Sequence, residues 1–121
     1  MKWKKILVVD DDVNLVLILE VRFQACHYEV VKAHDGEEGL RKALEEKPDL
    51  ILLDVLMPKM DGYQVMEQIR KRRDGLRNVP SIIMTGQSEL ESSFTTYQIH
   101  AFITKPFDAK ELMSEVQAIL G

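Results

Sequence analysis

The chain is poor in several features that define whole classes of protein. It has one cysteine in 121 residues, which excludes an internal disulfide and a metal site built from several cysteines. Its formal net charge is −4, so it offers no general attraction to nucleic-acid phosphates or anionic lipid. No apolar run could cross a bilayer, and the short run after the basic start lacks the pattern of a signal peptide. These absences predict a cytoplasmic protein that contacts neither membrane nor nucleic acid directly.

Nothing in the sequence divides it into parts, because it has no internal repeat and no low-complexity linker. A chain of 121 residues suits one domain, and folding at this size buries about two thirds of the surface that the unfolded chain exposes. Hydrophobic residues make up 45% of the chain, an ordinary share for a globular fold. We therefore expect one domain over residues 1–121.

Five short apolar segments predict β-strands. Residues 50–54 form an unbroken apolar run that ends in Asp54, and residues 6–9 form a second run that Asp10 follows. Neither run alternates with polar residues, which is typical of strands buried on both faces of a parallel sheet. The other segments are residues 29–33, expected at a sheet edge because of their mixed polarity, 79–86 and 101–104.

Helical patterns alternate with these strands. Apolar spacing predicts helices over residues 13–26, 36–47, from 62 to about 70 and 109–120, with a weaker helix over 88–98. Capping boxes are expected where Asp35 precedes Glu38 and where Asp108 precedes Glu111. The alternation of strands and helices predicts an α/β domain with a parallel, doubly wound sheet and right-handed crossovers.

The helix over residues 13–26 is apolar on more than one side. The face predicted to meet the core carries Leu15, Ile18, Leu19 and Phe23. Val16, Leu17 and Val21 extend the apolar surface beyond that stripe. Two interpretations stay open: a deeply buried helix, or an exposed apolar patch that docks a helix of a partner.

Two other groups have a chemical and a structural interpretation, and the structural one is favoured in each. Cys26 and His27 form a single pair, which is weak as a metal motif, and His27 is expected in a positive-φ turn that ends the helix. The four cations over residues 70–73 are typical of a nucleic-acid contact, but they also lie at a helix C-terminus, where cations are favoured.

Polar side chains stand where four of the predicted strands end. They are Asp10 and Asp11, Asp54, Thr85 and Lys105. In a doubly wound sheet, the carboxyl ends of neighbouring strands open into one crevice. The crevice would hold three carboxylates, a hydroxyl and an ammonium group, a set that suits Mg²⁺ together with an anionic phosphoryl group.

The chemistry expected of such a crevice is phosphoryl transfer. A carboxylate can act as the nucleophile, and Asp54 is the natural choice because it ends the middle strand. Mg²⁺ anchored by Asp10 and Asp11 would neutralise one side of the phosphoryl group, with Lys105 on another and a hydrogen bond from Thr85.

Four stretches of the chain resemble the receiver domain of two-component response regulators. They are residues 6–12, residues 52–62, Met84-Thr85-Gly86 and Lys105-Pro106-Phe107. They occur in the family's order and extend over nearly the whole chain. The resemblance implies a flavodoxin-like, five-stranded parallel sheet in the order 2-1-3-4-5 with helices on both faces.

The resemblance also implies a function. Asp54 would take a phosphoryl group from the phosphohistidine of a sensor histidine kinase or a histidine phosphotransfer protein. Asp11, Asp54 and the backbone carbonyl of Leu56 would bind Mg²⁺ directly, and Asp10 through water. Thr85 and Lys105 would contact the phosphoryl group, and the Lys105–Pro106 bond would be cis. The domain would catalyse only its own phosphorylation and dephosphorylation, and would switch an output face toward a downstream target or effector domain.

The sequence departs from the family pattern at several positions, among them Gln98 and Ile99, which replace the usual Gly-Ala. Phe102 stands where an aromatic switch residue, often tyrosine, is expected, and it has no hydroxyl group. Leu56 cannot orient an attacking water, so we expect a long-lived phosphoryl group.

Three other functions compete with this interpretation. A degenerate receiver would act only through protein contacts. A Mg²⁺-dependent phosphohydrolase would call for an acid at position 56, where the chain has Leu56. A flavin-binding module of the same fold is disfavoured because the acids at 10–12 would repel its phosphate.

Overall fold

The computed structural model describes residues 2–57, 59–86 and 99–121. Its strands are β1 (Lys5–Val9), β2 (Glu29–Ala33), β3 (Leu50–Asp54), β4 (Ser81–Thr85) and β5 (Ala101–Thr104). Its helices are α1 (Val13–Ala25), α2 (Gly36–Glu46), the short α3 (Gly62–Arg70), the 3-10 helix η1 (Gly75–Asn78) and α4 (Ala109–Leu120). The helix predicted over residues 88–98 lies outside the described residues.

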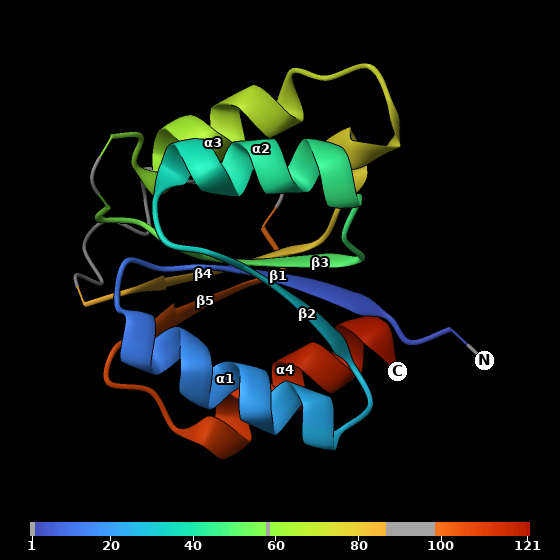
Figure 1. Cartoon of the computed structure of the whole chain (residues 1–121), viewed down its shortest axis with the longest axis vertical. Helices are drawn as coiled ribbons and strands as arrows, with labels where there is room; N and C mark the ends of the chain where they lie inside the picture. Colours follow the sequence, from blue (N-terminus) through green and yellow to red (C-terminus); the bar gives the residue numbers. More distant parts are fainter. Residues whose placement is uncertain (1, 58, 87–98) are drawn as a thin grey trace.

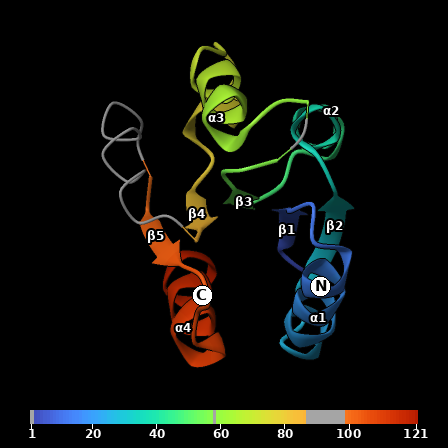
Figure 2. The same ribbon diagram turned by 90° about the vertical axis from the view of Figure 1, so that its left-hand side faces the viewer.

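The strands form one parallel sheet in the order β2-β1-β3-β4-β5, which confirms the predicted flavodoxin-like topology. Helices α2 and α3 cover one face of the sheet, and α1 and α4 cover the other (Figure 1). The view along the layers in Figure 2 shows the sheet between these two pairs of helices. The chain leaves β1 toward β2 on one side and reaches β3 on the other, so the carboxyl ends of β1 and β3 flank the topological switch point.

The core is two apolar layers, one on each face of the sheet. Alternate residues of the inner strands enter alternate layers: Leu52 packs on the α1 and α4 side, and Leu53 on the α2 and α3 side. Every residue of β3 and β4 is buried, as predicted for strands covered on both faces. The edge strands β2 and β5 are more exposed.

Helix α1 buries only part of the predicted face: Leu19 and Phe23 are buried as expected, but Val16 is buried in place of Ile18. Its buried residues are Val16, Leu19 and Phe23, whereas Ile18 is 55% exposed. The helix is apolar nearly all round, so its pattern does not reveal which side meets the sheet. Its exposed apolar residues form a stripe along the helix, hereafter the α1 stripe: Val13, Leu17, Ile18 and Val21. In the described ranges, no helix is long and apolar enough to span a membrane.

The two predicted capping boxes form only in part. The Asp35 carboxylate accepts from the Glu38 backbone N–H at 2.8 Å, as expected, but the Glu38 carboxylate accepts from the backbone N–H of His34, one residue beyond the box. Asp108 caps α4 through the second N–H of the helix rather than the third. Both acids therefore still begin their helices.

The turn after α1 agrees with its prediction. His27 has φ of 66°, and the N–H of Tyr28 donates to the carbonyl of Phe23 at 3.0 Å. This arrangement closes the helix in a Schellman-type turn. The interpretation of His27 as a structural residue is supported.

The segment between α3 and β4 differs from the prediction, because η1 occupies residues 75–78 and the fourth strand starts only at Ser81. Three of the cations at the end of α3 have local partners, among them Lys71, whose Nζ lies 3.6 Å from the Glu67 carboxylate. Arg70 donates to the carbonyl of Arg77 and to the Ser81 hydroxyl, and Arg72 forms an ion pair with Asp74 at 2.6 Å. These contacts favour the structural interpretation of the basic run, while the absence of a nucleic-acid contact stays a prediction.

Candidate functional site

The predicted site residues meet at the carboxyl edge of the sheet. Asp10 follows β1, Asp54 and Thr85 are the last residues of β3 and β4, and Lys105 follows β5. These four strands are consecutive neighbours in the sheet. The register pairs Asp54 with Met84, which places Thr85 one residue further along the same edge.

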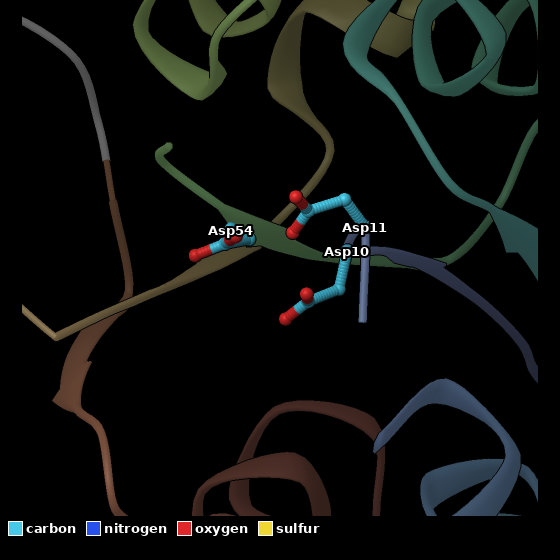
Figure 3. Close-up of side chains that lie close together, drawn as sticks. All are labelled: Asp10, Asp11 and Asp54. Atoms are coloured by element: carbon cyan, nitrogen blue, oxygen red, sulfur yellow. The ribbon is translucent and has the colours of Figure 1, made fainter. Parts of the chain in front are cut away.

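Three carboxylates cluster there, from Asp10, Asp11 and Asp54. One oxygen atom of each lies within 4.8 Å of the others, and this is the acidic group with metal-ligand spacing among the described residues. Figure 3 shows the three side chains gathered beyond the ends of β1 and β3. Asp10 is fully buried and Asp54 is 6% exposed, whereas Asp11 is exposed. The cluster is thus open to solvent on the side of Asp11.

Every polar atom of Asp10 has a partner. Its N–H donates to the carbonyl of Ala33 at 3.1 Å, and its carbonyl lies 3.3 Å from Nδ1 of His34. Its Oδ1 accepts from the Asp12 N–H at 2.9 Å, and its Oδ2 accepts from Nζ of Lys105 at 2.6 Å. Full burial of this carboxylate is tolerated because it is paired and hydrogen-bonded throughout.

Lys105 joins the acids of two strands. Its Nζ lies 2.6 Å from Oδ2 of Asp10 and 3.4 Å from Oδ1 of Asp54. Its backbone N–H donates to the carbonyl of Thr85 at 2.7 Å, which ties the end of β5 to the end of β4. The Lys105–Pro106 bond is cis, as the family resemblance implied.

The site shifts the ionisation of its groups. Burial, followed by the charge of Asp10, raises the pKa of Asp54 from 3.8 to about 6, and Lys105 only partly offsets the rise. Burial alone would lower the pKa of Lys105, but the hydrogen bond and charge of Asp10 and the charge of Asp54 outweigh it and raise that pKa. Asp54 is therefore a carboxylate that remains mainly ionised at neutral pH yet binds a proton, or a cation in its place, more readily than an ordinary aspartate.

The loop that leaves Asp54 is held by close packing. A Cβ on Gly62 would lie 2.5 Å from the carbonyl oxygen of Asp54, and the Gly62 N–H donates to the carbonyl of Val55 at 2.8 Å. Only a residue without a side chain lets α3 begin this close to β3. Asp61 and Gln64 form a reciprocal capping box there, in addition to the two predicted ones. Asp61 is thus the N-cap of α3.

The same loop also rests on α2. A Cβ on Gly36 would collide with the carbonyl oxygen of Met60. Lys59, at a positive φ of 71°, lies 3.6 Å from the carboxylate of Asp35. Lys59 and Met60 thus lie against the start of α2.

The remaining predicted residues differ in their burial. Thr85 is fully buried, Leu56 is 52% exposed two residues beyond Asp54, and Phe102 is partly buried in the layer under α2 and α3. The structure thus brings Asp10, Asp11, Asp54 and Lys105 together, places Thr85 at the same edge, and adds His34 to them. His34 was missed, although it directly follows the predicted strand over residues 29–33 and so lies at the same edge.

The donor set fits Mg²⁺. The ion prefers oxygen ligands, uses one or two carboxylates and keeps several waters. Asp11 offers a carboxylate exposed to solvent and Asp54 a buried one beside it, whereas both carboxylate oxygens of Asp10 already accept hydrogen bonds. A cavity of about 470 Å³ at the opposite edge of the sheet contains none of these residues.

The sequence is also similar to those of known proteins. The model of the response regulator receiver domain matches residues 6–117. Over 119 residues, which cover 97% of this chain, the sequence is 42% identical to the "Probable transcriptional regulator ycf27" of Cyanophora paradoxa. It is 41% identical, also over 119 residues and 97% of this chain, to the alkaline phosphatase synthesis transcriptional regulatory protein PhoP of Bacillus subtilis. In both cases the match covers 48% of the relative, so the chain spans about half the length of these curated relatives.

A solved structure is similar as well. The response regulator TrrA of Thermotoga maritima, in complex with Mg²⁺ and BeF, superposes with a TM-score of 0.86 at 33% identity. The superposition covers 97% of this chain and 99% of that one.

Proposed function

The chain belongs to the response regulator receiver domain family, and from that premise we propose that Asp54 is its phosphoacceptor. The observation that carries the proposal is the position of the Asp54 carboxylate, near the Asp11 carboxylate and 3.4 Å from the Lys105 ammonium group. We further propose that residues 1–121 form a single receiver domain. As a member of this family it is a signalling domain rather than a conventional enzyme.

The proposed reaction moves a phosphoryl group from a phosphohistidine to Asp54. A carboxylate oxygen of Asp54 forms a bond to phosphorus as the P–N bond to the imidazole breaks, and the leaving nitrogen keeps the electron pair and takes up a proton. The product is an aspartyl phosphate. Hydrolysis by water later breaks its P–O bond, releases inorganic phosphate and restores the carboxylate.

The other site residues would stabilise the charge that this transfer spreads over the phosphoryl oxygens. Lys105 supplies a cation and Thr85 a hydroxyl donor. Asp11, Asp54 and the Leu56 carbonyl would hold Mg²⁺, with Asp10 acting through water because its oxygens are already bonded. When bound, Mg²⁺ supplies positive charge beside the transferring oxygens.

We also propose where the phosphohistidine partner docks. The α1 stripe begins at Val13, three residues after Asp10, so it adjoins the mouth of the site. An apolar stripe along a helix suits the side of a partner helix that carries the histidine. Polar substitution at Leu17 and Ile18 should slow transfer from a purified sensor kinase that phosphorylates the wild type, but not from a small phosphodonor. Equal loss with both donors would contradict this docking site.

The phosphoacceptor proposal is tested by intact mass after incubation with phosphoramidate and Mg²⁺. We expect one added phosphoryl group, none in the presence of a chelator, and none in Asp54→Asn. Asp49→Asn is a matched control, because Asp49 precedes the amino end of the same strand and accepts from the backbone N–H of Lys5. A wild type that takes up no phosphoryl group would instead support a degenerate receiver. Catalytic release of phosphate from many equivalents of a phosphomonoester would support a phosphohydrolase.

A further inference from the structure

The exposed metal ligand Asp11 has no support of its own. Among the described residues, its carboxylate makes no hydrogen bond or ion pair, so its place depends on the backbone on either side. The peptide that follows is fixed, because the N–H of Asp12 donates to Oδ1 of Asp10 at 2.9 Å and the Asp12 side chain caps α1. On the other side of Asp11, the peptide group that joins it to Asp10 contains the backbone carbonyl of Asp10.

Among the residues that the structure describes, the side chain that contacts this carbonyl is His34. The distance from Nδ1 of His34 to the oxygen is 3.3 Å. A carbonyl can only accept, so Nδ1 carries the proton and donates. Asp10 is fully buried, and without this donor its carbonyl oxygen would lose its hydrogen bond. The ring thus sets the plane of the peptide that leads into Asp11.

His34 is itself held in place from two sides. Its backbone N–H donates to the carboxylate of Glu38 at 2.7 Å, which links it to the first turn of α2. The preceding residue, Ala33, accepts from the N–H of Asp10 at 3.1 Å, which continues the pairing of β2 with β1. The imidazole therefore reaches the Asp10 carbonyl from a rigid support. It does not belong to the acidic cluster itself, so it acts through Asp10.

We infer that His34 is a positioning residue for the metal site: its Nδ1–H orients the Asp10–Asp11 peptide and so presents the Asp11 carboxylate to Mg²⁺. The inference rests on the proposed function in taking Asp11 as a Mg²⁺ ligand. It assigns His34 no contact with metal or phosphoryl group. Partners that orient metal ligands typically change metal affinity by about 10- to 100-fold when mutated, and we expect the lower end because His34 acts through the backbone.

The test is the Mg²⁺ affinity of the unphosphorylated chain, measured by titration calorimetry with MgCl₂. His34→Phe keeps a ring without the donor, and we expect its dissociation constant to rise about tenfold. His34→Asn places an amide N–H near the position of Nδ1, and it should restore the affinity to nearly the wild-type value. His100→Ala is the matched control, because His100 is an exposed histidine before the amino end of β5, and it should bind as the wild type does.

A second readout separates positioning from loss of structure. In the rate of phosphorylation by phosphoramidate, His34→Phe should raise the Mg²⁺ concentration at half-maximal rate and leave the maximal rate unchanged. Unchanged Mg²⁺ affinity in His34→Phe, or an equal loss in His34→Asn, would overturn the inference. If the wild type binds Mg²⁺ but takes up no phosphoryl group, the proposed function fails while the affinities still decide the role of His34. If the wild type binds no Mg²⁺, both fail.

Discussion

The two edges of the sheet carry the same charged groups and use them differently. At the amino edge, Nζ of Lys5 lies 3.2 Å from Glu46 and 3.7 Å from Glu29, and its backbone N–H donates to Asp49. At the carboxyl edge, Lys105 lies 2.6 Å from Asp10 and 3.4 Å from Asp54, with Asp11 beside them. Each of these two groups thus consists of one lysine and three acids.

Burial distinguishes the two groups. The side chains of Glu29 and Glu46 are 49% and 37% exposed, whereas those of Asp10 and Asp54 are 0% and 8% exposed. Water screens the charges at the amino edge, and such ion pairs contribute little. At the carboxyl edge the surplus of negative charge is desolvated, which raises the pKa of Asp54 and favours a bound cation. The count of charges is therefore a poor guide to a site, and their burial a good one.

The largest difference should appear when each lysine is removed. Lys105→Met deletes the cation beside Asp54 and should slow phosphorylation by phosphoramidate about 100-fold or more. Lys5→Met should leave the rate unchanged, because its group lies at the other end of the strands. The rates are measured by intact mass at saturating Mg²⁺. Equal rates of phosphorylation in the two variants would show that the lysine at the carboxyl edge contributes no more to the reaction than the lysine at the amino edge.

When one acid at each edge is neutralised, only the substitution at the carboxyl edge should change the free energy of unfolding. The folded protein raises the pKa of Asp54 from 3.8 to about 6, so ionising Asp54 costs the folded state more than the unfolded one. This destabilisation is absent below about pH 4, grows as the pH rises and is complete above about pH 6. Without Mg²⁺, Asp54→Asn should therefore raise the free energy of unfolding at pH 7 by about 2–3 kcal/mol and change it little at pH 4.

Urea unfolding at the two pH values measures this effect, and Glu46→Gln is the control at the amino edge. A variant Asp54→Asn that is less stable than the wild type at pH 7 would contradict the raised pKa.

Mg²⁺ binding should depend on pH through the same carboxyl group. Below the Asp54 pKa of about 6 a proton competes with the ion, so the apparent affinity should fall by about tenfold for each further pH unit. Above that pKa the affinity should level off. Calorimetric titrations with MgCl₂ between pH 5 and pH 8 measure this pH dependence of the affinity. The range extends about one unit or more to either side of the raised pKa. An affinity that is flat across this range would mean that the ion does not bind Asp54.

The smallest effect concerns the lifetime of the phosphoryl group. Leu56 is 52% exposed at the mouth of the site and cannot orient a water molecule. A polar side chain at this position can orient the attacking water. Leu56→Asn should therefore speed hydrolysis of the aspartyl phosphate by several-fold, below the roughly 100-fold that general acid–base catalysis can contribute. Leu44→Asn, at an exposed leucine beside the amino-edge cavity, is the control. Decay of the phosphorylated mass after removal of the donor gives both rates.

Much of this structure follows from local sequence patterns. The non-alternating run that ends in Asp54 predicts a central strand, and three other strands end in polar residues of complementary chemistry. Because parallel strands share an edge, the site could be assembled without knowledge of any contact. The cis bond before Pro106 and the strand order came from the family resemblance instead.

The predictions that are wrong concern features for which the local sequence favours two arrangements equally and tertiary packing selects one. Helix α1 is apolar on all sides, so only its contact with the sheet determines that Val16 is buried and Ile18 exposed. Glu38 has two backbone N–H groups within reach, and it accepts from His34 rather than Asp35. His34 itself gives no signal in the sequence beyond its place after a strand, since its contact with Asp10 joins residues far apart in the chain.

The central claim is that the buried carboxylate at the end of β3 accepts the phosphoryl group. Reduction of the phosphorylated chain with borohydride converts an aspartyl phosphate to homoserine, and peptide mass spectrometry then locates it. We predict homoserine at position 54, dependent on Mg²⁺, with the other acids intact. Homoserine at Asp10, Asp11 or an amino-edge acid, or none at all, would contradict this account.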